Sequence, residues 1–348
     1  MDLRRHLLAG QVIPAHPLAL DRQRRFSERH QRAVTRYYLD AGVGGLAVGV
    51  HSTQFEIRDP RHGLYRPVLE LAAATAREHL ASSPRDLALI AGICGPTTQA
   101  LAEAGLARSL GYHAGLVSMA ALRTETEDEI ITHVATVAKV IPVVGFYLQP
   151  AVGGRLFSHR FWCRFAEIPE VVAIKIAPFN RYQTIDVVRA VAASGREDLA
   201  LYTGNDDTIV ADLLTPYAFP GRDGIVTRRI VGGLLGHWGV WTRSAVLLFQ
   251  QLQAAARAST LSADWLRQAN AVTDMNAALF DAANHFHGCI PGILEVLRRQ
   301  GLVESIQCLN PAEVLSPGQA DELSRVNAAY PDLVDDTFVA EHRDRWLR

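Results

Sequence analysis

The sequence lacks the features that mark membrane-spanning, secreted and nucleic-acid-binding proteins. No apolar stretch approaches the ~20 residues of a membrane span, and the first residues lack the apolar core of a signal peptide. Its four cysteines are far apart and form no CxxC pair, so they signal neither a zinc site nor a disulfide framework. The formal net charge of -1 provides no attraction to nucleic acid or anionic lipid. We therefore expect a cytoplasmic protein with a small-molecule partner.

Short apolar runs alternate with longer amphipathic segments along the first two thirds of the chain. Each run ends at glycine, proline or polar residues, as buried parallel strands do. Eight such runs are present, at Gln11–Ala15, Gly44–Val50, Leu87–Ile93, Ala114–Met119, Val143–Gln149, Val171–Ala177, Leu199–Asn205 and Asp223–Arg228. Eight strands alternating with helices predict an α/β fold, a (β/α)₈ TIM barrel, rather than an open doubly wound sheet.

Helical periodicity fills the intervals between these runs and the end of the chain. It predicts barrel helices at Arg25–Ala41, Leu64–Leu80, Thr97–Leu110, Glu127–Val140, Thr184–Ala193 and Thr208–Tyr217. After about residue 230 the strand signals stop, and further helices are predicted at Ala245–Ala256, Ala263–Phe286, Pro291–Gln300 and Pro317–Ala328. We expect the barrel to span residues 1–245 and a helical C-terminal extension packed on it to span residues 246–348.

Lysine is scarce, because Lys139 and Lys175 are the only two among thirty-five basic residues. Arginine stays protonated, whereas a desolvated lysine can lose its proton and become a nucleophile. Lys139 falls in the last turn of a predicted helix, where a cation suits the helix dipole.

Lys175 instead lies inside the apolar run Val171–Ala177, where an unpaired ammonium is costly to bury. An inward polar group near the carboxyl end of a barrel strand is typical of a catalytic residue, and a neutral amine there can form an imine with a carbonyl. A structural lysine that snorkels or pairs with a buried acid is the alternative.

The residues around Lys175 resemble those of the dihydrodipicolinate synthase and N-acetylneuraminate lyase family of Schiff-base barrel enzymes, from Gly10 to about Val303. In that family an imine-forming lysine on the sixth strand follows, by 28 residues, a tyrosine that opens a Y-N-x-P motif. Lys175 in Val172-Ala173-Ile174-Lys175 stands in the matching place, and Tyr147 in Tyr147-Leu148-Gln149-Pro150 falls at that spacing. The resemblance thus implies Lys175 as nucleophile and Tyr147 as proton shuttle.

Further segments resemble family motifs in the same order along the chain. They are Ala91-Gly92-Ile93 with Thr97, Thr203-Gly204-Asn205-Asp206-Asp207 after strand seven, Asp223-Gly224-Ile225-Val226 for strand eight, and Ile290-Pro291 in the closing helix. By this resemblance we expect Gly204, Asn205, Asp206 and Val226 to bind substrate. Asp206 is equally interpreted as an N-cap of the helix that starts near Thr208.

The sequence also departs from the family pattern. The G-T-T-G-E loop that binds the keto-acid carboxylate is replaced by Gly49-Val50-His51-Ser52-Thr53-Gln54-Phe55-Glu56. We expect Ser52 and Thr53 to donate hydrogen bonds to a carboxylate or to Tyr147, and His51 to serve as an acid or base; ordinary loop polarity is the alternative. The arginine that follows Y-N-x-P in dihydrodipicolinate synthases aligns with Val152, with Arg155 three residues later. The aromatic residue of the relay between subunits falls near Leu122 or Arg123.

No cofactor or metal is expected. The glycines at 42–45 and 232–233 form neither a P-loop nor a dinucleotide fingerprint. In Asn284-His285-Phe286-His287 the two histidines are two apart, so on a helix they face different directions.

The predicted function is therefore an aldolase, lyase or dehydratase that acts on a 2-keto acid or keto-sugar acid through an imine, in a homo-oligomer (dimer or tetramer) by resemblance. Two alternatives stay open. One is metal-assisted or acid/base isomerisation by His51, Glu56 and His113. The other is a non-catalytic barrel that binds a ligand.

Overall fold

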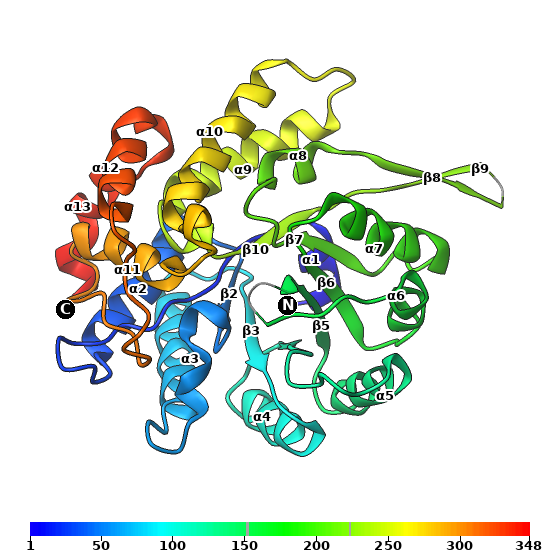
Figure 1. The fold of residues 1–348 in the computed structure, drawn as a ribbon, viewed down its shortest axis with the longest axis horizontal. Coiled ribbons are helices and arrows are strands. Elements are labelled where there is room, and N and C mark those ends of the chain that lie inside the picture. The colour runs from blue at the N-terminus through cyan, green and yellow to red at the C-terminus, as the bar shows by residue number, and fades with distance from the viewer. Residues whose placement is uncertain (151–152, 223) are drawn as a thin grey trace.

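The structure is a computed structural model that describes residues 1–150, 153–222 and 224–348. Eight strands form one sheet in which every pairing is parallel, in the order β1-β10-β7-β6-β5-β4-β3-β2. A parallel bridge between Ala15 and Ala47 joins the first and last strands, so the sheet closes. The strands are β1 (Val12–Pro14), β2 (Gly45–Val48), β3 (Ala88–Ile93), β4 (Ala114–Val117), β5 (Val143–Leu148), β6 (Val171–Ala177), β7 (Ala200–Thr203) and β10 (Gly232–Leu235). The predicted (β/α)₈ barrel is confirmed (Figure 1).

Helices surround this barrel, as the periodicity predicted. They are α2 (Glu28–Ala41), α3 (Tyr65–Ser82), α4 (Thr97–Ser109), α5 (Glu127–Ala138), α6 (His159–Ala166), α7 (Arg181–Ser194), α8 (Ile209–Leu214) and α9 (Thr242–Arg257). The sequence prediction missed α6, which has only eight residues. Ser158 caps its amino end, and the Ser158 side chain accepts a hydrogen bond from the Phe161 N–H. It also extended α8 too far, because Tyr217 begins another strand.

The barrel interior is filled with small and branched side chains, which leaves little space at its amino end. Inward residues include Ile13, Ala47, Ile90 and Leu116. A short helix that the sequence prediction missed, α1 (Leu3–Leu8), closes this end, and the Tyr202 hydroxyl donates to the Leu7 carbonyl at 2.8 Å. Any ligand must therefore enter from the carboxyl end of the strands.

The eighth barrel strand is not where the sequence placed it. The run expected at residues 223–228 forms β9 (Gly224–Arg228), which pairs antiparallel with β8 (Tyr217–Gly221) in a separate hairpin; Asp223 itself lies outside the described residues. The barrel strand is β10, which begins with Gly232 and Gly233. A Cβ on Gly233 would lie 2.6 Å from the Trp238 ring. This close approach requires glycine. Because glycine has no side chain, it adds nothing to the apolar pattern from which a strand is predicted.

The β8–β9 hairpin extends away from the barrel (Figure 1). Its base is held where Tyr217 donates to Asp212 at 3.1 Å. Beyond the base, Ile225 is 69% exposed and Val226 is 38% exposed. A two-stranded hairpin is only marginally stable in water by itself, so its exposed apolar side chains call for a packing partner.

The chain after β10 is helical, in agreement with the prediction. It contains α9, α10 (Asp264–Leu279), α11 (Cys289–Arg299), α12 (Gln319–Ala329) and α13 (Asp336–Trp346). The expected domain boundary at residue 245 falls inside α9. The helix predicted to reach Phe286 ends at Leu279, because Asp281 has a φ of 57° that no α-helix accommodates. Among the helices of the described residues, none is long and apolar enough to cross a membrane.

A buried histidine next to β1 should make the fold sensitive to acid. His16 is fully buried between Thr35 and Gln31, and burial lowers its pKa from 6.5 to about 4. The unfolded chain therefore binds this proton more readily, so stability is lost as pH falls from 6.5 towards 4. At ~1.4 kcal/mol per pH unit, the His16 contribution is on the order of 3 kcal/mol.

Urea unfolding of wild type and His16→Gln at pH 7 and pH 4.5 measures this contribution. We expect the free energy of unfolding to depend less on pH in the variant. His62→Gln, at an exposed loop position, is the matched control and should keep the wild-type dependence. An unchanged pH dependence in His16→Gln would contradict the assignment.

Candidate active site

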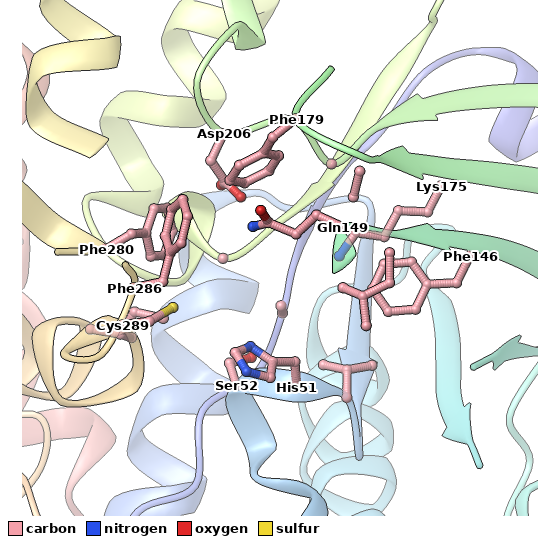
Figure 2. A pocket seen from close by; sticks show the side chains of 17 residues that line it. His51, Ser52, Phe146, Gln149, Lys175, Phe179, Asp206, Phe280, Phe286 and Cys289 are labelled. Atoms are coloured by element: carbon pink, nitrogen blue, oxygen red, sulfur yellow. The ribbon is translucent and has the colours of Figure 1, made fainter. Parts of the chain in front are cut away.

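A cavity opens at the carboxyl end of the barrel strands, where the catalytic groups of this fold are found. Its volume is about 70 Å³, several times the ~10–15 Å³ that one water molecule needs on the same measure. Figure 2 shows side chains that converge on it from strand ends, from the loop after β2 and from the segment before α11. The polar ones are His51, Ser52, Gln149, Lys175, Asp206 and Cys289.

Lys175 reaches the cavity from β6, as the sequence predicted. The residue is only 8% exposed, and its Nζ lies 4.5 Å from the centre of the Phe146 ring. Burial lowers its pKa below the usual 10.5, although the nearby Asp206 carboxylate opposes this shift. A lowered pKa increases the fraction of neutral amine, which is the nucleophilic form.

Gly204 allows Lys175 to take this position. It lines the cavity, and a Cβ there would lie 2.5 Å from the Cε of Lys175 and 2.7 Å from the Cβ of Ala177. A side chain at residue 204 would therefore displace the lysine. The glycine is needed for close packing.

Asp206 faces the same cavity from the loop after β7. Its Oδ1 accepts a hydrogen bond from the His237 N–H at 3.1 Å, and its carbonyl accepts one from Asn276 Nδ2 at 2.5 Å. Burial raises the pKa of this carboxyl, while the charge of Lys175 lowers it. Burial therefore shifts both Lys175 and Asp206 towards their uncharged forms.

Asn205 lies beside the cavity but does not line it. Its amide Nδ2 donates to Thr184 and Asp212, and its Oδ1 accepts from the Phe179 N–H at 3.0 Å. All three bonds tie β7 to neighbouring segments. The structure therefore places Asn205 as a support of the loop and not at the expected substrate contact.

The loop after β2 carries His51, Ser52 and Thr53, which the sequence analysis grouped, but only two of them line the cavity. It begins with η1 (His51–Thr53), and His51 and Ser52 line the cavity. The buried Ser52 hydroxyl has no hydrogen-bond partner among the described residues. Thr53 Oγ1 instead donates to the His16 carbonyl at 2.6 Å and accepts from the Gly49 N–H at 3.0 Å. Thr53 thus holds the loop in place and does not line the cavity.

His51 is held in its neutral form. Burial, reinforced by the charge of Lys175, lowers the pKa of His51 from 6.5 to about 4. Above pH 5 the imidazole is therefore uncharged, so it offers a hydrogen bond and accepts a proton only weakly.

The structure does not bring Tyr147 into the cavity. Its ring packs against Phe157 and Trp162, with ring centres 5.9 and 4.9 Å away, in the layer between barrel and helices. Among the residues that the structure describes, the only hydrogen bond to its hydroxyl is a 3.5 Å contact from the Phe157 N–H. The inward position is occupied by Phe146.

A one-residue irregularity between β5 and β6 explains this difference. Val143 pairs with Val171, but after the shift Phe146 pairs with Lys175 and Tyr147 with Ile176. Because neighbours in register face the same side of a parallel sheet, the shift turns Tyr147 outward. Val172 and Ala173 both belong to the interior cluster, which marks the place where the alternation breaks.

We therefore expect Tyr147→Phe to retain turnover within about twofold, because the lost hydroxyl contacts neither Lys175 nor the cavity. Steady-state rates of the variant, compared with wild type once a substrate is found, measure this. Trp162→Phe, which changes the same packing layer, is a suitable control for indirect effects. A loss of more than about 10²-fold, the size typical of a proton-transfer group, would return Tyr147 to the mechanism.

Other expected site residues are elsewhere. Val226 is on the exposed hairpin and not in the cavity, which corrects its assignment to substrate binding. Arg155 donates to the carbonyls of Leu122 and Glu125 and does not line the cavity, and Val152 lies outside the described residues. His113 precedes β4 at the amino end of the barrel, so it is not grouped with His51 and Glu56.

No three His, Cys, Asp or Glu side chains in the described parts of the chain are placed to hold a metal ion. His285 and His287 are in a turn around η5 (Ala282–Asn284) rather than on a helix, and neither lines the cavity. Cys289 does, at the start of α11, and burial raises the pKa of its thiol.

Sequence reasoning missed several lining residues. Gln149 stood inside the quoted Tyr147–Pro150 segment, where its amide was a usable signal. Cys289 and the apolar residues Phe179, Phe280, Phe286 and Ile293 come from loops and C-terminal helices, and no periodic pattern connects them to the barrel strands.

The fold was compared with known proteins. No protein-family model matches the sequence, and no curated protein is significantly similar to it. Solved structures do match. Dihydrodipicolinate synthase from Agrobacterium tumefaciens has a TM-score of 0.73 at 19% identity, over 94% of this chain and 99% of its own. The enzyme of that name from Aquifex aeolicus gives 0.72 at 17% identity, over 94% and 99%.

N-acetylneuraminate lyase from Fusobacterium nucleatum, solved with pyruvate, gives a TM-score of 0.71 at 16% identity, over 93% of this chain and 97% of its own. The match extends over nearly the whole of both chains. The chain therefore has the fold of the dihydrodipicolinate synthases and N-acetylneuraminate lyases, which confirms the resemblance at the level of architecture.

Proposed function

We propose that this protein is a divergent Schiff-base lyase, an aldolase or dehydratase that acts on a 2-keto acid or keto-sugar acid. One observation carries the proposal. Lys175 is buried, inward-facing and of lowered pKa in a cavity at the carboxyl end of the barrel. The fold shared with two groups of lyases supports it.

The chemistry begins with the neutral amine of Lys175. The amine attacks the carbonyl carbon, a proton moves from nitrogen to oxygen, and the resulting carbinolamine loses water to give the imine. Once protonated, the imine accepts electrons from an adjacent bond. In an aldolase, a substrate hydroxyl loses its proton, the adjacent C–C bond breaks to release an aldehyde, and an enamine stays on the lysine. In a dehydratase, loss of a C–H proton gives the enamine, which then expels a protonated hydroxyl as water and becomes an unsaturated imine. A proton added to carbon returns the aldolase enamine to an imine, and in either case water hydrolyses the imine to release the product and regenerate the lysine.

Asp206 takes the proton-transfer role in this proposal. It is the ionisable group that shares the cavity with Lys175 and whose pKa burial shifts upward, towards neutral pH. An acid or base works best when its pKa is near the working pH. Tyr147, which the family resemblance suggested, is separated from the cavity by its outward orientation.

Ser52 is proposed to bind the acid group of the substrate. Its buried hydroxyl lacks a partner among the described residues and lines the cavity. A buried hydroxyl without a partner costs free energy that a bound carboxylate would recover. Gln149, whose amide points into the cavity in Figure 2, offers a second donor.

Trapping the imine tests the proposal. The protein is incubated with pyruvate, 2-ketobutyrate or a 2-keto-3-deoxy sugar acid, reduced with borohydride, and digested for mass spectrometry. We expect at least one keto acid to add its reduced mass to the peptide that contains Lys175. Absence of an adduct across this panel, extended to aromatic keto acids such as phenylpyruvate, refutes imine chemistry.

A homo-oligomer is part of the proposal and rests on the family resemblance together with the exposed apolar hairpin. We expect a dimer or tetramer in sedimentation velocity, and a shift towards monomer for Ile225→Asp, because Ile225 is 69% exposed on β9. Leu266→Asp is the matched control, because Leu266 lies on α10 and is 75% exposed. This variant should leave the assembly intact. A wild-type monomer would refute this part alone.

A further inference from the structure

The side of the cavity opposite Lys175 is mostly apolar. Figure 2 shows Phe179, Phe280 and Phe286 across from the lysine, together with Asp206 and Cys289. Ile293 and Leu148 add to the apolar lining of the cavity. No arginine, and no lysine besides Lys175, is among the lining residues that the structure describes. Such a wall offers nothing to neutralise a phosphate or a second carboxylate.

Two of these phenylalanines occupy unfavourable backbone conformations. Phe179 has a φ of 50° and Phe286 a φ of 66°, both in the left-handed region that side chains other than glycine rarely adopt. Backbone strain of this kind persists only where surrounding contacts impose it, and it gathers at ligand-binding sites.

Specific hydrogen bonds hold Phe179 and Phe286 in these left-handed backbone conformations. The Phe179 N–H donates to Asn205 Oδ1 at 3.0 Å, and the Phe286 N–H donates to the Asp281 carbonyl at 3.0 Å. Asp281 is buried and itself has a φ of 57°, and its carboxylate accepts from the Gly288 N–H at 2.9 Å. Both ends of the arrangement are thus fixed before any ligand arrives.

The result is an aromatic pair built from distant parts of the chain. Phe179 follows β6, whereas Phe286 precedes α11, and their rings meet edge to face with centres 5.7 Å apart. Phe280, at the end of α10, lies against Gly236, where a Cβ would lie 3.1 Å from its ring. Rings preorganised in this way bind flat apolar groups at small entropic cost.

We propose that the carbonyl substrate carries an aromatic or bulky apolar group, which binds between Phe179, Phe280 and Phe286 while its carbonyl carbon lies at Lys175. This inference rests on the proposed function and names its substrate class. It sets the enzyme apart from lyases that act on polyol chains, because the surface that faces the distal part of the substrate is a phenylalanine wall.

The experiment separates binding from imine chemistry. Benzyl alcohol, which has no carbonyl, and glycerol, a smaller and fully polar alcohol, are titrated into wild-type protein and followed by calorimetry and saturation-transfer NMR. Benzaldehyde and glyceraldehyde are compared in parallel by borohydride trapping. We expect benzyl alcohol to bind at least about tenfold more tightly than glycerol, and benzaldehyde to be trapped faster.

Variants assign the site. Phe286→Ala should weaken benzyl alcohol binding about tenfold. Phe286→Leu keeps apolar bulk, serves if the alanine variant folds poorly, and should weaken the binding less. Leu266→Ala, on the surface, should not change it. Equal or tighter binding of glycerol, or unchanged affinity in both Phe286 variants, overturns the proposal. Benzyl alcohol binding without any trapped aldehyde or keto acid refutes the Schiff base and leaves the aromatic site standing.

Discussion

Lys175→Met should abolish both turnover and the borohydride-trapped adduct. Without an amine no imine forms, so we expect a loss of at least about 10³-fold. Methionine fills the volume beside Phe146 and Gly204 without a charge, and removing a buried cation from an apolar strand should not destabilise the fold. Single-turnover trapping and thermal unfolding, measured on the same preparation, separate the two effects.

The composition of the chain supplies the matched control. Lys139, the only other lysine, is an exposed residue at the end of α5. Lys139→Met should therefore keep full activity and the full adduct. Lys175→Arg places at this position a cation that stays protonated, so this variant should fold and be inactive. An adduct that persists in Lys175→Met, on Lys139 or the chain's amino terminus, would show nonspecific amine chemistry.

The barrel and the inward position of Lys175 could be predicted from the sequence for one physical reason. Parallel strands buried on both faces read as apolar runs, and a lysine within such a run has few positions open to it except the interior. Seven of the eight strands overlapped their predicted runs because their residues express this burial. The eighth failed because Gly232 and Gly233 are required by packing against Tyr202 and Trp238, and glycine carries no strand signal.

The orientation of Tyr147 was beyond the reach of sequence for a different reason. Spacing along the chain measures residues, whereas orientation in a sheet depends on register. One irregularity near Val143 converts the 28-residue offset of Val143 and Val171 into the 29-residue offset of Phe146 and Lys175. Nothing in the local residue types of Val171–Ala173 announces that shift, because all three are apolar and buried.

The apolar wall was unpredictable for a third reason, which is the distance of its parts in sequence. Phe286 lies over a hundred residues after Phe179, and the two meet only because the C-terminal helices return to the mouth of the barrel. In sequence Phe286 was part of a histidine cluster assigned to a continuous helix. The helix ends before it, at Leu279, and the left-handed backbone of Phe286 is held by a hydrogen bond from its N–H to the Asp281 carbonyl.

Asp206→Asn provides the second large effect, and it distinguishes proton transfer from nucleophilic attack. If Asp206 moves protons on and off the intermediates, turnover should fall by about 10²–10⁴-fold. The amide keeps the size of the carboxyl and can still accept from the His237 N–H, so the loop should stay in place. Asp207→Asn, the neighbouring residue that does not line the cavity, should retain turnover within a few-fold.

The pH dependence has a definite sign. The Asp206 carboxylate raises the pKa of Lys175, whereas burial lowers it. Asparagine removes the opposing effect, so the pKa of Lys175 falls further and more of the amine is neutral at a given pH. The rate of borohydride trapping should therefore rise with pH in both proteins, with its rising limb at lower pH in Asp206→Asn, even as turnover collapses. A rising limb that stayed in place or moved to higher pH would contradict the electrostatic effect of Asp206 on Lys175.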